Sequence, residues 1–206
     1  MTLRPRSTPD ETRHRIMNAA EEQFRRVGYA KTAVADIANA LNMSPANIYR
    51  FFASKLAINE AICRRFLAES EARMAEIVAG DDPAPQRIAR LIRTLHMLNR
   101  SRFVGEQRVH EMVAVAMSEN WHSIEEHITL VVTSLTTLVS QGMASGHFAN
   151  GDARAMALTV KDCCGCLLHP QMIAECVRHD RDMQDMCDRL IDFILAGLSA
   201  RHGARP

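Results

Sequence analysis

Apolar residues recur at helical spacing along almost the whole chain. In the last such segment, residues 181–200, they fall at offsets 0, 3, 4, 7, 8, 11 and 15. These residues are Met183, Met186, Cys187, Leu190, Ile191, Ile194 and Leu198. The spacing puts them on one broad face of a helix. No segment shows the alternation of apolar and polar residues that is typical of a half-buried strand. The pattern therefore predicts an all-α protein.

The first predicted helix has a complete start signal. Thr8 is a candidate N-cap, Pro9 occupies the first helical position and Glu11 completes a T-x-x-E capping box. Apolar residues then recur at helical spacing up to Gly28, where the pattern stops. We expect an amphipathic helix over residues 9–27.

Two short helices joined by a tight turn follow. Thr32 is the candidate N-cap of the first. The apolar positions of this helix are Val34, Ile37, Ala38 and Leu41. A turn near Asn42 leads to Ser44 and Pro45, a cap followed by a proline at the first helical position, so a new helix is expected over residues 45–52. A longer helix followed by two short helices in this way is the helix-turn-helix arrangement.

Helical patterns continue to the C-terminal end, with one linker. A fourth helix begins at Ser54 and is expected to run to about residue 78, before the break GDDPAP. Further helices are expected at residues 84–100, 104–118, 121–145, 152–168, 171–178 and 181–200. The sequence thus predicts two domains. Residues 1–55 form the helix-turn-helix domain, with its connecting helix reaching about residue 79, and residues 80–206 form a second helical domain.

Composition places the chain among ordinary globular proteins. Of its 206 residues, 47% are hydrophobic and 24% are charged, which excludes a disordered or collagen-like chain. The net charge is +1, whereas residues 1–60 hold nine basic and six acidic residues, a local excess of +3. There is no apolar run as long as a membrane helix, and the polar N-terminus has no signal core. We therefore expect a cytoplasmic protein whose six cysteines are thiols.

The third predicted helix has a composition suited to DNA. Ile48 and Phe52, four positions apart, can pack inward against the first helix. The outer face and helix start are then left to Pro45, Ala46, Asn47, Tyr49, Arg50 and Phe51. Small residues allow close approach to a groove, Asn47 and Arg50 supply hydrogen-bond donors for bases or phosphates, and Lys55 adds a charge at the next helix start.

The stretch GYAKTAVADIANALNMSPANIYRFFASKLAINEAI resembles the DNA-binding signature of the TetR family of bacterial transcriptional regulators, and the resemblance covers about residues 12–62. The matching positions are Gly28, Thr32, Val34, Ile37, Ala38, Ser44, Tyr49, Phe52, Ser54 and Lys55. The resemblance implies that Thr32 is a phosphate-contacting cap and that Ser44 caps the recognition helix. It further implies that Tyr49 and Lys55 contact the DNA backbone, and that Ala46, Asn47 and Arg50 approach the groove.

Two positions depart from the family pattern. Ala33 stands where the family often has Ser, which removes one possible phosphate donor. Phe51 stands where the family very often has His or Tyr. A phenyl ring cannot hydrogen-bond a phosphate, so we expect Phe51 to pack on the sugar backbone, touch a thymine methyl group or brace the fourth helix.

The family resemblance implies that the second domain binds a ligand and forms a homodimer. A twofold dimer can read two half-sites about 34–36 Å apart, which one helix-turn-helix cannot. We expect the interface on the helix at 152–168 and on the last helix, which would form a four-helix bundle with their partners. The interface candidates are Met156, Val160, Cys163, Cys164, Leu167, Met186, Leu190 and Ile194.

A ligand cavity is the second expectation for this domain, because methionine-rich walls adapt to varied ligands. The candidates for its lining are Met97, Phe103, Met112, Met117, Trp121, Ile124 and Ile128. At any single position, an ordinary core residue is the alternative. The two DNA-binding domains of a dimer must have a particular spacing to bind the operator. A ligand that binds better to a dimer with another spacing would shift the population away from the DNA-binding conformation.

Other chemistry has weaker sequence support. KDCCGCLLH, residues 161–169, contains a single C-x-x-C pair, which is half of a metal site. A regulator responsive to copper or another soft metal, using Cys and Met, is therefore the alternative function. No Gly-rich phosphate loop or G-x-S-x-G motif occurs, so neither an enzyme nor a cofactor is expected. A helical adaptor that binds another protein through Tyr49, Phe51 and Phe52 is a further alternative. Its binding would depend little on salt concentration, whereas DNA binding weakens steeply as salt rises.

We interpret the sequence as that of a ligand-responsive, homodimeric transcriptional regulator, most simply a repressor that binds an inverted-repeat operator and is released by a small molecule. Activation of transcription is the open alternative. Double-stranded DNA, a second copy of the chain and a small effector are the expected partners.

Overall fold

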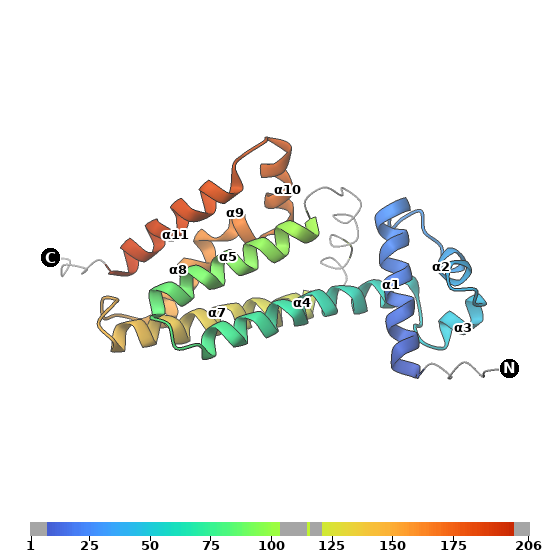
Figure 1. The fold of residues 1–206 in the computed structure, drawn as a ribbon, viewed down its shortest axis with the longest axis horizontal. Helices are drawn as coiled ribbons and strands as arrows, with labels where there is room; N and C mark the ends of the chain where they lie inside the picture. Colours follow the sequence, from blue (N-terminus) through green and yellow to red (C-terminus); the bar gives the residue numbers. More distant parts are fainter. Residues whose placement is uncertain (1–7, 104–114, 116–120, 200–206) are drawn as a thin grey trace. The chain divides into compact units, whose positions relative to one another are not determined.

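The computed structural model describes residues 8–103, residue 115 and residues 121–199, and every regular element in these ranges is a helix (Figure 1). The helices are α1 (Pro9–Val27), α2 (Val34–Ala40), α3 (Pro45–Tyr49), α4 (Lys55–Ala79), α5 (Ala84–Phe103), α7 (Trp121–Ala144), α8 (Ala153–Cys163), α9 (Gly165–Leu168), α10 (Pro170–Arg178) and α11 (Met183–Ser199). The predicted all-α class is confirmed. The helix predicted at 104–118 lies outside the described residues.

The described residues fall into two compact units, one of residues 8–66 with 115 and 121, and one of residues 67–103 with 122–199. The division falls within α4, which therefore carries residues of both units. The predicted domains had placed this helix as a connection ending near residue 79, and their exact boundary stays a prediction.

The first unit has a small core made by four helices. Its fully buried apolar side chains are Ile16, Ala20, Phe24, Ile37, Ala38, Ile48, Ile58 and Ile62. The three-residue and four-residue spacings in this set are the ones that the sequence pattern gave for α1, α2 and α4. The core thus fixes which side of α3 faces away from it.

The start of α1 has the predicted capping box. The Thr8 amide donates to Oε2 of Glu11 at 2.9 Å, and the Glu11 amide donates to Oγ1 of Thr8 at 3.2 Å. Two of the amides that have no partner within the helix are satisfied in this way. At the other end, Gly28 has φ 101°, a backbone conformation that favours glycine. The bounds 9–27 are confirmed.

The N-cap of α2 is Ala33, so the prediction that Thr32 caps this helix is wrong. Thr32 is only 2% exposed, and its hydroxyl donates to the carbonyl oxygen of Gly28 at 2.8 Å. The hydroxyl is therefore used inside the turn that ends α1. The Ala33 amide donates to Oδ2 of Asp36 at 2.8 Å, so a side chain of the first turn of α2 supplies the hydrogen bond to the N-cap amide.

The turn between α2 and α3 follows the sequence prediction closely. Asn42 has φ 53°, the left-handed conformation that asparagine tolerates. Ser44 caps α3, and its Oγ accepts from the Asn47 amide at 3.3 Å. The helix ends at Tyr49, earlier than the predicted residue 52, and Arg50 is its C-cap. α3 is thus one and a half turns long, as about 3.6 residues make one turn.

The second unit is built around α5, which packs against α9, α10 and α11 (Figure 1). Ile88, Leu91, Ile92 and Leu95 of α5 are almost completely buried. The other elements contribute buried residues that include Leu135, Leu138, Val139, Ala157, Leu167, Ile173, Met183, Cys187 and Ile191. None of the described helices is both long and apolar enough to cross a membrane.

The single helix predicted over residues 152–168 is two helices in the structure. α8 ends at Cys163, Cys164 is its C-cap with φ −79° and ψ 3°, and α9 begins at Gly165. Glycine lowers helix stability at this point, and the break lets both Cys164 and Leu167 become buried. His169 is extended, as expected for a residue before proline, so the chain turns again into α10.

Candidate nucleic-acid interface

The recognition helix α3 has buried apolar residues on one side and exposed polar residues elsewhere. Ile48 is fully buried and Phe52 is 4% exposed, as predicted. Tyr49 is 52% exposed, and Ala46 and the C-cap Arg50 are exposed as well. Asn47 is half-buried at the helix start. The structure thus brings a hydroxyl, an amide and a guanidinium together on one short helix, over a small alanine side chain.

Phe51 lies directly behind this face. Its ring is half-buried, its amide donates to the carbonyl oxygen of Ile48 at 2.9 Å, and its own carbonyl oxygen accepts from Nη1 of Arg13 at 2.6 Å. The Arg13 guanidinium also lies 4.4 Å from the centre of the Phe52 ring. Phe51 and Phe52 therefore hold the end of α3 against α1. Sequence reasoning missed Arg13, because nothing near it in the chain indicates a partner 38 positions away.

Lys55 does not point away from the unit. Its Nζ donates to the carbonyl oxygens of Tyr29 at 2.7 Å and Thr32 at 2.9 Å, and lies 3.4 Å from that of Ala30. Nζ is also 4.4 Å from the centre of the Tyr29 ring. Burial lowers the pKa of Lys55. Thr32 and Lys55 were both predicted to contact phosphates. In the structure Thr32 is buried, and the side chain of Lys55 points toward the turn that follows α1.

Lys31 is the exposed cation of this turn and was not selected from the sequence. It lies between Ala30, whose carbonyl faces Lys55, and the buried Thr32. The signal that could have found it is its place two residues before the N-cap of α2, where a basic side chain can reach a phosphate that the helix start approaches.

The structure describes the side chains of three of the seven residues predicted to line a ligand cavity, and the cavity itself stays a prediction. Met97 is 63% exposed and Ile128 is 39% exposed, whereas Ile124 is half-buried. Met112 and Met117 lie outside the described residues, as do the side chains of Phe103 and Trp121.

A group of buried polar side chains occurs in the same unit and was not predicted. Arg102, only 9% exposed, donates from Nη1 to Oγ of Ser70 at 3.1 Å and from Nη2 to Oε2 of Glu69 at 2.5 Å. Nδ1 of His127 lies 3.3 Å from Oε1 of Glu71. Burial lowers the pKa of His127, the hydrogen bond to Glu71 opposes this effect, and the charge of Arg102 adds to it.

His96 of α5 is a further buried polar side chain of this unit. It is 1% exposed, and its Nδ1 lies 3.0 Å from the carbonyl oxygen of Leu167. Because a carbonyl only accepts, Nδ1 carries the proton of this hydrogen bond. Asn99, almost one turn further along α5, donates to the next carbonyl oxygen, that of Leu168, at 2.9 Å. These contacts tie α5 to the end of α9.

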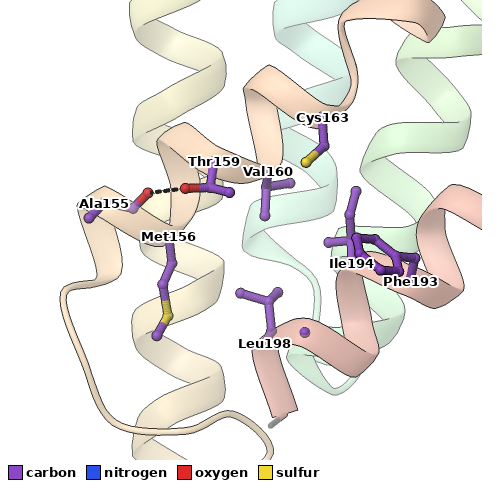
Figure 2. Close-up of a pocket in the computed structure, with 9 residues that line it drawn as sticks. Ala155, Met156, Thr159, Val160, Cys163, Phe193, Ile194 and Leu198 are labelled. Carbon is purple, nitrogen blue, oxygen red and sulfur yellow. Dashed lines mark hydrogen bonds between the residues drawn. The ribbon is translucent and has the colours of Figure 1, made fainter. Parts of the chain in front are cut away.

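An apolar groove of about 340 Å³ lies between α8 and α11 (Figure 2). Its lining residues are Ala155, Met156, Thr159, Val160, Cys163, Phe193, Ile194, Gly197 and Leu198. Figure 2 shows Val160 and Cys163 on α8 and Phe193 and Ile194 on α11. Phe193 is 71% exposed, the largest exposed fraction among the large hydrophobic residues of the described ranges.

The predicted interface residues divide between this groove and the interior. Met156, Val160, Cys163 and Ile194 line the groove, although Val160 and Ile194 are only 3% and 5% exposed. Cys164 and Leu167 are buried within the chain, whereas Met186 and Leu190 are half-buried. Phe193 was missed, because the apolar stripe of α11 that faces inward does not include it.

The cysteines give no support to a metal site in the described ranges. No group of three or more His, Cys, Asp or Glu side chains there is placed to hold one metal ion. Cys164 and Cys187 are buried and the other four cysteines are half-buried thiols.

Comparison with known proteins identifies the class to which this fold and this helix face belong. Residues 16–62 match the family described as bacterial regulatory proteins, tetR family, and residues 84–191 match the tetracyclin repressor-like C-terminal domain. The second match covers more than half of the chain. The chain therefore belongs to the TetR family, whose members are DNA-binding transcriptional regulators.

Solved structures share the whole fold at low sequence identity. A regulator of the TetR/AcrR family from Thermobifida fusca YX-ER1 is 20% identical, with a TM-score of 0.62 over 95% of this chain and 100% of its own. A TetR-family regulator from Pectobacterium atrosepticum is 18% identical, with a TM-score of 0.68 over 96% and 99%. The fatty acid degradation regulator of Bacillus halodurans is 16% identical, with a TM-score of 0.67 over 98% and 100%. No curated protein of significant similarity was found.

Proposed function

We propose that the protein is a cytoplasmic repressor that binds an inverted-repeat operator as a homodimer and leaves it when a small molecule binds the second unit. The observation that carries this proposal is the polarity of α3. Its apolar side, Ile48 and Phe52, is buried, and its outer side presents Tyr49, Asn47 and Arg50. Asn and Arg are the side chains that form paired hydrogen bonds with adenine and guanine edges.

These three side chains divide between base contacts and a backbone contact in the proposal. Asn47 and Arg50 read base edges in the major groove, because Asn47 is only half-buried at the start of α3 and Arg50 is exposed at its C-terminal end. Tyr49 contacts a backbone phosphate through its hydroxyl. Ala46 leaves room for the helix to enter the groove, and Ser44 fixes the first turn of α3 through the Asn47 amide.

Dimerisation follows from the small size of the recognition helix and from the groove between α8 and α11. One five-residue helix reaches few base pairs, whereas two copies related by a twofold axis read two half-sites. The groove, with the exposed Phe193 ring in its lining, is an apolar surface that a second copy of the chain would cover from water. We assign this surface to the partner subunit.

The second unit is the proposed effector site. Buried Arg102 and His96 and the half-buried His127 add hydrogen-bonding groups to a largely apolar interior, which is the usual composition of a small-molecule site. α4 carries residues of both units, so a change of its position on effector binding would reach the DNA-binding unit.

Selection of bound DNA from a random pool tests the proposal. The expected result is an enriched inverted repeat with half-sites about one helical turn apart. With that operator, Asn47→Ala or Arg50→Ala should relax the preference at one or two base pairs, and Tyr49→Ala should weaken binding to all sequences about equally. If no sequence is enriched, or if all three variants bind as the parent does in a mobility-shift titration, the proposed function is wrong.

A further inference from the structure

The first residue of α4 holds the turn that precedes α2. Nζ of Lys55 faces the carbonyl oxygens of Tyr29 at 2.7 Å, Thr32 at 2.9 Å and Ala30 at 3.4 Å. We call this arrangement the lysine clamp. Its cation also lies 4.4 Å from the centre of the Tyr29 ring, which packs edge-on against Phe24 of α1 at 5.1 Å.

The clamp uses the full hydrogen-bonding capacity of the side chain. An ammonium group has three protons and no acceptor, and three carbonyl oxygens lie within hydrogen-bonding distance of it. A phosphate contact would require at least one of these bonds to break, and the freed carbonyl would lose a charged partner. The break would also release part of the turn that these three bonds hold together.

We propose that Lys55 is a positioning residue for DNA binding, which fixes the turn before α2 against the start of α4 and contacts no phosphate. This inference rests on the proposed DNA-binding function. The turn joins α1 to α2, and α2 packs against both α1 and α3. A change at the clamp therefore alters the placement of the helix pair, although Lys55 itself lies behind it.

The neighbouring Lys31 supplies the comparison that the inference needs. It lies in the same turn and is exposed, whereas Lys55 is half-buried with a pKa lowered by desolvation. Both lysines carry one positive charge on a four-carbon stem, so substitution by methionine removes the same charge and keeps a similar length in each case. Lys31→Met is thus the matched control for Lys55→Met.

The salt dependence of operator binding separates a phosphate contact from a positioning role. Each neutralised phosphate contributes about −0.9 to the slope of log K against log salt concentration. A contact made once by each subunit of a dimer would therefore contribute about −1.8. We expect Lys55→Met to weaken binding by about tenfold or more at every salt concentration with the slope unchanged, and Lys31→Met to make the slope shallower.

A local change in the turn must be distinguished from general unfolding of the variants. Affinity is determined for the folded, active fraction, well below the unfolding midpoint. Amide hydrogen exchange of Lys55→Met should speed up between Tyr29 and Ala33 while the interior of α1 keeps its protection. Lys55→Arg keeps the charge, but its planar fork does not match three converging carbonyls, so it should not restore affinity.

Three results would overturn the inference: a slope that becomes shallower in Lys55→Met as it does in Lys31→Met, an affinity equal to that of the parent, or full restoration by Lys55→Arg. If the parent protein selects no DNA, the proposed function fails instead. Hydrogen exchange in the turn still decides in that case whether Lys55 holds it.

Discussion

Arg13 on α1 donates from Nη1 to the carbonyl oxygen of Phe51 at 2.6 Å, directly after the recognition helix. The same guanidinium lies over the Phe52 ring, 4.4 Å from its centre. α3 is only five residues long and has few bonds of its own to hold its last turn. The position of its C-terminal end therefore depends on a side chain from the first helix.

Replacement of Arg13 by alanine should loosen the end of α3. We expect a loss of about 1 kcal/mol in the free energy of unfolding, from one charged hydrogen bond and one exposed cation–π contact. Operator affinity should fall as well. Urea denaturation and mobility-shift titration measure the two effects. Arg15→Ala, at another exposed position of α1, is the control, and equal behaviour of the two variants would contradict the bracing role.

Gly142 has no room for a side chain. A Cβ atom at this position would lie 2.1 Å from Cδ2 and 2.3 Å from Cε2 of the buried Phe148 ring. Gly142→Ala should lower the free energy of unfolding by about 1–3 kcal/mol, because the ring must leave its site. In Gly165→Ala the nearest atom would be Sδ of Met172 at 4.0 Å, so this control should leave stability unchanged or raise it. Thermal unfolding followed by circular dichroism compares the two.

His127 should make stability depend on pH below neutrality. Burial lowers its pKa in the folded protein, so as the pH falls through about 6.5 the unfolded chain takes up the proton first. Stability contributed by His127 is thus present above pH 6.5 and is lost as the pH falls toward the folded pKa. The difference in unfolding free energy between the parent and His127→Asn should shrink between pH 7.5 and 5.5. A difference that grows as the pH falls would show the opposite shift.

Phe193 should control the oligomeric state. A carboxylate at this exposed position would be buried without a partner in a dimer that closes over the groove between α8 and α11. Phe193→Glu should therefore sediment as a monomer at concentrations where the parent is a dimer. Met97→Glu changes a residue of α5 that is 63% exposed and serves as the control. If Phe193→Glu stays dimeric, the subunits meet elsewhere.

Cys63 and Cys164 should be unreactive until the protein unfolds. Burial raises the pKa of both thiols to about 12, with a smaller contribution from Glu21 for Cys63 and from neighbouring thiols for Cys164. The thiolate is the reactive species, and three pKa units reduce its population about a thousandfold near pH 8. Iodoacetamide labelling followed by peptide mass spectrometry should detect both only in urea. Rapid labelling of either in the native protein would contradict this burial.

Local signals in the sequence were sufficient for most of the first unit. The capping box of Thr8 and Glu11, the cap Ser44 and the spacing that buries Ile48 and Phe52 involve residues a few positions apart, and the structure confirms each. Thr32 was assigned wrongly because its hydroxyl can either cap α2 or bond back to Gly28, and only the turn that ends α1 decides between the two.

Long-range contacts to the main chain were beyond sequence reasoning. Arg13 and Lys55 both donate to carbonyl oxygens at least 23 positions away, and a carbonyl is the same in every residue. In the second unit, an apolar stripe does not distinguish the chain's own core from a partner's surface. Val160 is therefore buried, whereas Phe193, outside the predicted stripe, is exposed.

The lysine clamp constrains substitution at position 55 more strongly than at the positions that supply its acceptors. Its acceptors are peptide carbonyls, so any amino acid at positions 29, 30 and 32 supplies them. The donor, by contrast, is one particular side chain with three protons at the end of a long flexible stem. Many amino acids should therefore be tolerated in the turn, within the limits set by the packing of Tyr29 and Thr32. At position 55, only lysine can form the clamp.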